Sequence, residues 1–122
     1  MMEIIANAPS HFSVLSGDDS LALPVIACGG RGVIAVISNY APKRFGDLVR
    51  AALKGDYAEA RSLQYGLLPM MKLNFIESNP IPVKFILSQL GMMEEIYRLP
   101  LTPASISSKE AILFGMKQCG IE

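Results

Sequence analysis

Two short, largely apolar segments open the hydrophobic pattern of this chain, at residues 12–15 and 33–37. Both are rich in β-branched and aromatic residues, and apolarity of this kind suits strands that are covered on both faces, as in a parallel sheet. A helix over residues 20–28, capped by Asp19 or Ser20 and ended by Gly29 and Gly30, links the two segments. The pattern therefore predicts one right-handed βαβ unit whose two strands are parallel neighbours.

Helical spacing dominates the remainder of the chain. Four apolar residues share one face of a helix predicted over residues 44–54, namely Phe45, Leu48, Val49 and Leu53. From Asp56 a second apolar stripe keeps helical spacing for about five turns, with a kink expected at Pro69. Its members are Tyr57, Ala60, Leu63, Leu67, Met71 and Phe75.

Three further helical pieces are expected outside these two. We predict that residues 1–7 form the last turns of a helix, and that residues 83–90 form another helix after the rigid proline-containing link at 78–82. Ser107 or Ser108 caps a final helix that reaches Gln118, with Gly120 as its stop. The chain is predicted to be helix-dominated with an α/β beginning.

Polar and small residues follow each predicted strand, at positions 16–19 and 38–40. In parallel α/β architectures, ligands bind beyond the carboxyl ends of the strands, so we expect any site to lie there. Gly17 leaves the backbone free to approach a small ligand. Asp18 and Asp19 point in opposite directions on an extended backbone, which argues against a shared ligand. We expect one to cap the following helix and the other to bind loop amides.

Composition narrows the classes of function. The 11 basic and 11 acidic residues balance, so no charge excess favours a nucleic-acid partner. No apolar run approaches the ~18 residues that a membrane span requires, and the N-terminus lacks the features of a secretory signal. We therefore expect a cytoplasmic protein with no membrane partner.

The chain is short and apolar at the same time. Its 122 residues are about half of the roughly 250 in a complete (β/α)8 barrel. It is nevertheless 51% hydrophobic, with a mean hydropathy of +0.35, which favours apolar surface that another segment or subunit covers. Cys28 and Cys119 have no spacing typical of a metal site, and we expect both to be ordinary buried thiols. Neither a metal nor a cofactor is expected.

Three sequence blocks carry a resemblance to a known family. Ser16-Gly-Asp-Asp19, Gly29-Gly-Arg-Gly-Val-Ile34 and Glu77-Ser-Asn-Pro-Ile-Pro-Val-Lys84 together resemble the C-terminal part of the dihydrodipicolinate synthase family. These are pyruvate-dependent lyases built on a TIM barrel. The resemblance implies an α/β fold that is a C-terminal fragment of the barrel. Residues 1–54 would form the last two βα units, and residues 55–122 would form a C-terminal helical region.

The resemblance also implies where substrate binds. It places Gly17 in the wall of the pyruvate pocket and Ile34 in contact with pyruvate through its backbone. Taken from the residues alone, Ile34 is equally consistent with core packing. The family's Schiff-base lysine lies on an earlier strand, and its tyrosine relay comes from the earlier half of the barrel. We therefore predict no catalytic residue in this chain.

The other candidate groups have simpler interpretations. All six lysines fall on predicted helices or at their ends, and Lys84 is expected to make a structural ion pair or hydrogen bond. The glycine-rich segment at 29–32 precedes a strand, unlike a phosphate-binding loop, which opens a helix. We interpret it as a helix-to-strand turn. His11, the one histidine, is expected at the surface.

Two classes of function remain open. The first is the C-terminal portion of a lyase that condenses pyruvate with aspartate semialdehyde through a lysine Schiff base, on the lysine and diaminopimelate pathway, and that is inactive alone. Another 2-keto acid aldolase, such as N-acetylneuraminate lyase, is an alternative within this class. The second is a non-catalytic assembly or oligomerisation module, which would pair with an N-terminal half-barrel or with copies of itself. The helix at 20–28 lies near a subunit contact by resemblance.

Overall fold

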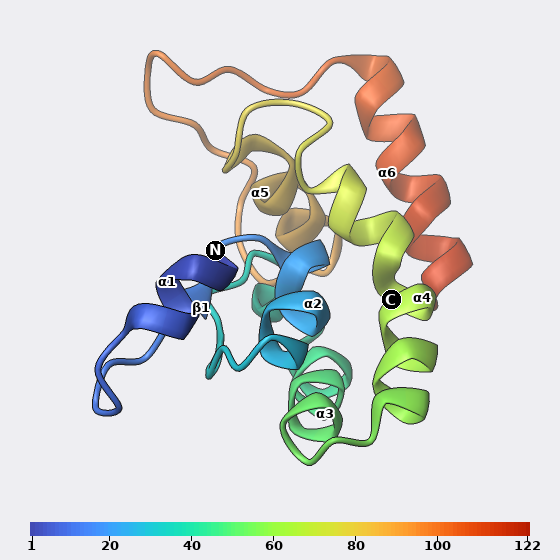
Figure 1. The fold of residues 1–122 in the computed structure, drawn as a ribbon. Helices are drawn as coiled ribbons and strands as arrows, with labels where there is room; N and C mark the ends of the chain where they lie inside the picture. The colour runs from blue at the N-terminus through green and yellow to red at the C-terminus, as the bar shows by residue number, and fades with distance from the viewer.

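The computed structural model describes all residues, 1–122, and contains one small parallel sheet and otherwise mainly helices (Figure 1). Strands β1 and β2 pair in parallel, with Leu15 opposite Gly32 and Ser16 opposite Val33. The elements in chain order are α1 (Met2–Asn7), β1 (Leu15–Ser16), the 3-10 helix η1 (Asp19–Leu21), α2 (Ala22–Ala27), β2 (Gly32–Val33), the 3-10 helix η2 (Ile37–Asn39), α3 (Pro42–Leu53), α4 (Tyr57–Leu73), α5 (Ile81–Gln89) and α6 (Ile106–Cys119).

The predicted βαβ unit is confirmed, but its strands are shorter and less covered than expected. Phe12 is 56% exposed and Leu15 is 45% exposed. Each strand has a single neighbouring strand, so the backbone hydrogen bonds of the sheet form along only one edge of each strand. Two further bonds, from the Arg31 amide to the Val14 carbonyl and from the Ile34 amide to the Ser16 carbonyl, extend it slightly. The expectation that both faces are covered is wrong for this chain.

Helices α3 and α4 follow the predicted apolar stripes in their interiors. Phe45 and Leu48 of α3 are buried, whereas Leu53 at its end is 51% exposed, contrary to its predicted place on the buried face. Asp56 caps α4 by accepting a hydrogen bond from the Glu59 amide at 3.1 Å. Helix α4 contains Pro69 and ends at Leu73.

The ends of the predicted stripe on α4 lie at the surface, because both are at or beyond the helix ends. Tyr57 is 45% exposed at the first helical position, and Phe75 is 47% exposed two residues past the last one. Between them the stripe packs inward as predicted, with Ala60, Leu67 and Met71 buried. The apolar pattern thus located the helix better than it located the limits of its buried face.

Two helix starts differ from prediction. Helix α5 begins at Ile81 with Pro82 in its first turn, where a missing amide hydrogen is tolerated. Helix α6 is capped by Ser105, whose hydroxyl accepts from the Ser108 amide at 3.2 Å; Ser107 and Ser108 lie inside the first turn. Gly120 ends α6 in the left-handed conformation with φ 59°, as predicted.

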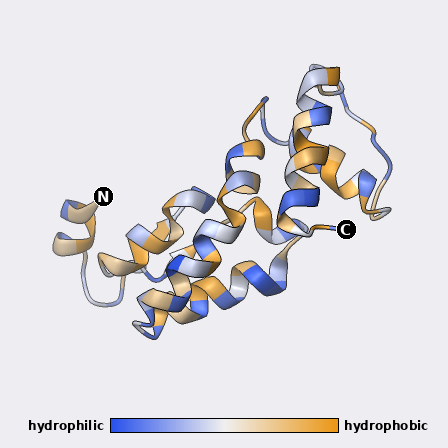
Figure 2. Ribbon diagram, turned by 90° about the vertical axis from the view of Figure 1, so that its right-hand side faces the viewer, coloured by the Kyte–Doolittle hydropathy of each residue, from blue (hydrophilic) through white to orange (hydrophobic).

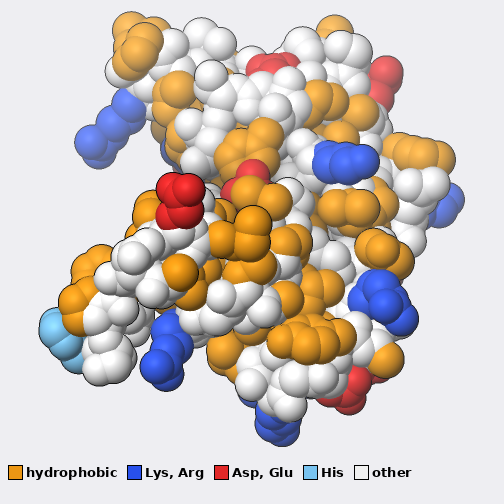
Figure 3. Space-filling view, in the orientation of Figure 1, with side chains coloured by type: hydrophobic (Ala, Val, Ile, Leu, Met, Phe, Trp, Pro, Cys, Tyr) orange, Lys and Arg blue, Asp and Glu red, His pale blue; other side chains and the backbone are white.

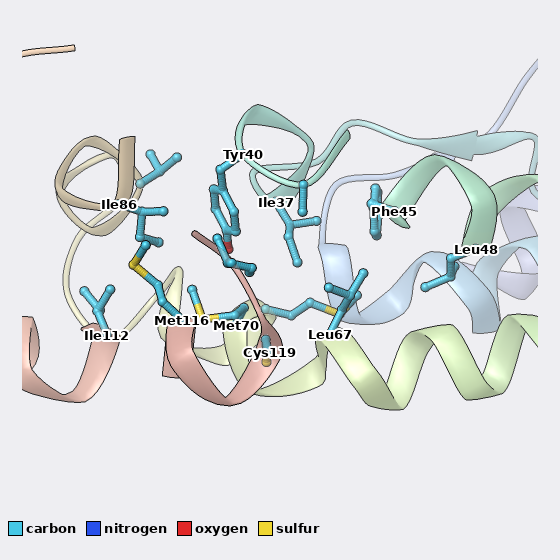
Figure 4. Packing of buried hydrophobic residues seen from close by; sticks show 14 of the residues in the cluster. Ile37, Tyr40, Phe45, Leu48, Leu67, Met70, Ile86, Ile112, Met116 and Cys119 are labelled. Atoms are coloured by element: carbon cyan, nitrogen blue, oxygen red, sulfur yellow. The ribbon is translucent and has the colours of Figure 1, made fainter. Parts of the chain in front are cut away.

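One main core joins the two regions of the chain. Its 16 buried residues come from both sides of position 54: from Ala22 of α2, the segment after β2, helices α3 to α6, and Ile121. Figure 4 shows Ile37 and Tyr40 reaching from the segment after β2 toward Met70 and Leu67 of α4. The division at residues 54 and 55 stays a prediction, since side chains from 1–54 and from 55–122 share this core.

Outside the core, hydrophobic side chains are numerous at the surface. Hydrophobic and hydrophilic residues alternate along the helices (Figure 2), and Figure 3 shows apolar side chains spread across one whole face. Helix α1 contributes no buried residue and lies at one end of the molecule (Figures 1 and 2). No helix has the length and apolar character needed to cross a membrane.

The predictions for the histidine and the two cysteines are confirmed in part. His11 is exposed, as predicted. Cys119 is buried, but Cys28 is exposed at the end of α2, so the expectation of two buried thiols is wrong for Cys28. Helix α2 ends at Ala27, and Cys28 follows it as the C-cap.

Candidate functional site

A cavity of about 470 Å³ lies beyond the carboxyl ends of β1 and β2, where they face the start of α5. It combines apolar side chains, two asparagines and one cation. The residues that line it are Gly17, Ile34, Ala35, Val36, Asn39, Asn79, Pro80, Val83, Lys84 and Leu87. Both residues that the sequence assigns to a substrate pocket, Gly17 and Ile34, are among them.

Gly17 and Ile34 follow directly after the two paired strands and so lie side by side. The Ile34 amide donates to the Ser16 carbonyl at 2.9 Å, which ties the two strand ends together. The Ile34 side chain is 74% exposed, so the alternative of core packing is wrong for this chain. Nothing lies within 4 Å of the position that a Cβ on Gly17 would occupy. The cavity wall at Gly17 is therefore open.

Asp19 fixes the backbone that forms the second side of the cavity. Its carboxylate is buried, 1% exposed, and accepts hydrogen bonds from the amides of Val36 at 2.8 Å and Ile37 at 2.9 Å. The side-chain amide of Asn74 donates to the same carboxylate at 2.9 Å. Because a buried carboxylate needs such donors, Asp19 holds the segment after β2 in one conformation.

The Asp19 interaction continues into the core through Asn74. The Tyr40 hydroxyl donates to the Asn74 side-chain oxygen at 2.7 Å. Burial raises the pKa of Tyr40 well above its ordinary value, so the phenol stays protonated and remains a donor. The resulting chain of three buried side chains links the end of α4 to both loops that border the cavity.

Asp18 has the other role that the sequence predicted for the acidic pair. Its carboxylate accepts from the Ser20 amide at 2.7 Å and from the Ser20 hydroxyl at 2.6 Å, and so caps η1. The prediction that one aspartate caps a helix while the other binds loop amides is confirmed. The expected cap at Asp19 or Ser20 is wrong by one residue, because Asp18 is the last extended residue.

Lys84 is the one charged residue in the cavity lining. Its ammonium group donates to the Ile96 carbonyl and lies 5.2 Å from the centre of the Tyr97 ring. The predicted structural hydrogen bond of Lys84 is confirmed. The other lysines also lie on helices or at their ends, as predicted. None follows β1 or β2.

Asn39 lies in the segment 38–40, where the sequence predicts a site, whereas Asn74 and Asn79 were not singled out. Asn79 lies within the block that ends at Lys84, so its neighbours could have indicated it. Asn74 carries no local signal, because its position near the site depends on how α4 packs. No group of three or more His, Cys, Asp or Glu side chains is arranged to hold a metal ion.

The segment at 29–32 forms the turn between α2 and β2, as predicted, at the opposite end of the strands from the cavity. Gly29 adopts φ 101°, which favours glycine. A Cβ on Gly30 would lie 2.5 Å from a methyl carbon of Val25 and 2.8 Å from the Val25 carbonyl oxygen. These glycines therefore permit a tight helix-to-strand connection.

Comparison with known proteins identifies the family. The model of the Dihydrodipicolinate synthetase family matches residues 1–118. A 4-hydroxy-tetrahydrodipicolinate synthase of Pelodictyon phaeoclathratiforme is 50% identical over 119 residues, which are 98% of this chain and 40% of that protein.

Solved structures agree with the sequence comparison. The dihydrodipicolinate synthase of Aquifex aeolicus matches with a TM-score of 0.96 and 45% identity, over 98% of this chain and 41% of that one. The chloride-inhibited enzyme of Acinetobacter baumannii, in complex with pyruvate, matches with a TM-score of 0.95 and 33% identity, over 99% and 42%. The fold is accordingly that of part of a TIM barrel. The chain belongs to the dihydrodipicolinate synthetase family and spans about 40% of the length of the relatives it matches.

Proposed function

We propose that this chain is the C-terminal portion of a dihydrodipicolinate synthase-type lyase and supplies one wall of its pyruvate pocket. The observation that carries the proposal is the meeting of Gly17 and Ile34 at the ends of two paired strands, on one cavity. The related Acinetobacter baumannii enzyme binds pyruvate.

The proposed reaction condenses pyruvate with aspartate semialdehyde. A lysine amine attacks the pyruvate carbonyl and releases water, and the resulting imine loses a methyl proton to become an enamine. The enamine carbon then forms a bond with the aldehyde carbon of the second substrate. Such an amine must lie at the barrel mouth. Lys84 is the one lysine that lines the cavity, and its ammonium group contacts the Ile96 carbonyl and the Tyr97 ring. We infer that the nucleophile is supplied from outside these residues.

In this mechanism the chain helps to bind the substrate and forms one wall of its pocket, and it supplies no reacting group. Gly17 offers an open wall to the substrate, and Ile34, whose amide already donates to Ser16, can offer only its carbonyl. Asp19 keeps the opposite segment in place. Preorganised peptide groups stabilise charge without rearranging during the reaction. We expect no turnover by the chain alone.

A chimeric enzyme tests this proposal. This chain replaces the matching segment of the Pelodictyon phaeoclathratiforme relative, to which it is 50% identical, and condensation is measured against pyruvate concentration. We expect an active chimera, and a higher KM for pyruvate after Gly17→Val, which fills the open wall. Gly66→Ala is the matched control, because its Cβ meets only ordinary contact at 3.7 Å. A folded chimera without activity, or with the same pyruvate KM after Gly17→Val, would contradict the proposal.

An assembly role is the second candidate, and the exposed apolar side chains around the sheet favour it. Phe12, Leu15 and Ile34 are 56%, 45% and 74% exposed on or next to two strands whose outer edges are unpaired. Such edges and faces favour pairing with further strands. The partner would be an N-terminal half-barrel or another copy of this chain. Light scattering distinguishes these cases: a monodisperse monomer that does not bind the remaining part of the Aquifex aeolicus relative would rule out the assembly role.

A further inference from the structure

One short segment, residues 34–39, supplies four of the ten residues that line the cavity. It follows β2 and runs through η2, and its lining residues are Ile34, Ala35, Val36 and Asn39. The segment is fixed from outside the cavity, because the amides of Val36 and Ile37 donate to the buried carboxylate of Asp19. Any group that fixes the Asp19 carboxylate therefore also fixes a large part of the cavity wall.

Asn74 contacts the Asp19 carboxylate from the core. It is 0% exposed, directly follows the last residue of α4 and lies 55 positions from Asp19 in the sequence. Its amide nitrogen donates to Asp19 Oδ2 at 2.9 Å, and its amide oxygen accepts from the Tyr40 hydroxyl at 2.7 Å. Asn74 does not line the cavity, so any effect on the cavity passes through these neighbours.

A neutral amide satisfies both neighbours of position 74 at once. A carboxamide presents donors at one end and an acceptor at the other, whereas an ionised carboxylate only accepts. The reversed amide would place its oxygen against an oxygen of Asp19, and two acceptors repel each other. An ionised carboxylate at position 74 would do the same. An aliphatic side chain would give neither Asp19 nor Tyr40 a partner, at the cost of buried polar groups that lack hydrogen bonds.

We propose that Asn74 is a positioning residue for the cavity: through Asp19 it holds residues 34–39 in the conformation that receives the ligand. The inference rests on the proposed function, in that it takes this cavity as the site for pyruvate. Asn74 is not assigned any contact with the ligand. It adds to the wall at Gly17 and Ile34 a buried residue that determines the shape of the neighbouring segment.

Asn74→Asp tests this role, because it keeps the shape of the side chain and makes its donor depend on pH. Two buried carboxylates in contact do not both ionise readily, so the pair formed with Asp19 keeps one proton to a pH above the ordinary carboxyl range. With that proton, position 74 still donates to Asp19. Once the proton is lost, the two carboxylates repel each other and the segment that depends on Asp19 shifts.

The other titratable groups near position 74 do not produce the same signal. Burial raises the pKa of Tyr40 above its ordinary value of 10, so the phenol stays protonated. Cys119 of α6 faces Tyr40, and its contribution is measured in the parent chain, which is titrated alongside. The three ion pairs of the structure involve neither Asp19 nor Tyr40.

The first measurement uses the 122-residue chain labelled with ¹⁵N, without a ligand. The amide shifts of Val36 and Ile37 are followed from about pH 5 to about pH 9, between the ordinary pKa values of carboxyls and phenols. In Asn74→Asp we expect both amides to match the parent at the acid end and to move away in one shared step as the pH rises. Asn74→Leu, of similar size and without a donor, should differ from the parent at every pH.

Tyr40→Phe is the matched control. It removes a hydrogen bond from the same Asn74 amide but leaves the contact between Asn74 and Asp19 in place. Its Val36 and Ile37 amides should therefore follow the parent across the whole range, even where the variant is less stable.

The second measurement places the same variants in the chimera with the Pelodictyon phaeoclathratiforme relative and follows KM for pyruvate and kcat. We expect the ratio of the Asn74→Asp KM to the parent KM to rise about tenfold from the acid to the alkaline end, the size of one hydrogen bond to a charged group. Asn74→Leu should show the raised KM at every pH, and Tyr40→Phe should not. Partial unfolding would lower the apparent kcat and leave KM unchanged, so KM separates positioning from stability.

The outcomes distinguish this inference from the proposed function. Val36 and Ile37 shifts that follow the parent at every pH in both Asn74 variants overturn the role of Asn74, whatever the chimera does. The expected shifts together with an unchanged KM also overturn it and leave the proposed function standing. The expected shifts together with an inactive parent chimera support the hold of Asn74 on the segment and contradict the proposed function.

Discussion

Replacing Asp19 by asparagine should destabilise the chain far more than the same change at Asp18. The two residues are adjacent and chemically identical, but their surroundings differ. The Asp19 carboxylate is 1% exposed and accepts three hydrogen bonds from other parts of the chain. Asp18 only caps η1 locally, through Ser20. The pair therefore supplies its own control.

The expected magnitude follows from the donors that face each carboxylate. An asparagine at position 19 keeps one oxygen, and its amino group must face either the Val36 amide or the pair formed by the Ile37 amide and Asn74. One or two buried donors lose their partner, at about 1–3 kcal/mol each. We expect a loss of about 2–4 kcal/mol for Asp19→Asn, a large part of the ~5–15 kcal/mol typical of a domain. Asp18→Asn keeps an acceptor and should lose less than about 1 kcal/mol.

Urea unfolding followed by circular dichroism measures the two free energies of unfolding. Hydrogen exchange adds a local measurement, since the amides of Val36 and Ile37 should exchange faster in Asp19→Asn and remain protected in Asp18→Asn. Equal unfolding midpoints for the two variants, or unchanged protection of both amides, would refute the claim that Asp19 holds this side of the cavity.

Two further predictions concern packing and pH. Gly30→Ala should destabilise by about 1–3 kcal/mol in thermal unfolding, because its Cβ would lie 2.5 Å from a Val25 methyl carbon and 2.8 Å from the Val25 carbonyl oxygen; Gly17→Ala, which meets nothing within 4 Å, is the control and should be near neutral. Hydrogen bonds from the Ser108 hydroxyl and the Ser105 amide lower the pKa of Glu77 below its ordinary value of 4.5. The stabilisation from these hydrogen bonds is therefore present above pH 4.5 and lost as the pH falls below it. The free energy of unfolding of Glu77→Gln should accordingly depend less on pH below 4.5 than that of the parent chain. An identical pH dependence of stability in the variant and the parent chain would contradict this cause.

Local chemistry made much of the site predictable. The alternating roles of Asp18 and Asp19 follow from an extended backbone that points neighbouring side chains apart, together with the preference of aspartate for caps and loop amides. Gly17 and Ile34 were assigned to one pocket by the family resemblance; the sequence pattern put Ile34 inside a strand, whereas in the structure it follows β2. The Lys84 hydrogen bond was predictable from its position on a helix, though its partner on the loop after α5 was not.

The errors arise where tertiary context decides. The apolar content of residues 12–15 and 33–37 predicts fully covered strands, but with one neighbour each they pair over only two residues. Cys28 is exposed because α2 ends beside it. Ser105, Ser107 and Ser108 are all acceptable caps, and only the path of the preceding loop, fixed in part by Glu77, selects Ser105. Asn74 joins the site through the packing of α4, which no local pattern encodes.

The central claim is that this chain shapes a pyruvate pocket but does not hold the nucleophile. Intact mass spectrometry after incubation with pyruvate and borohydride tests it directly, because the reductant converts a lysine imine into a stable amine. The account predicts an unchanged mass for this chain, both alone and mixed with the remaining part of the Aquifex aeolicus relative, and an adduct on the latter partner only. A stoichiometric, reducible pyruvate adduct on a lysine of this chain would contradict it.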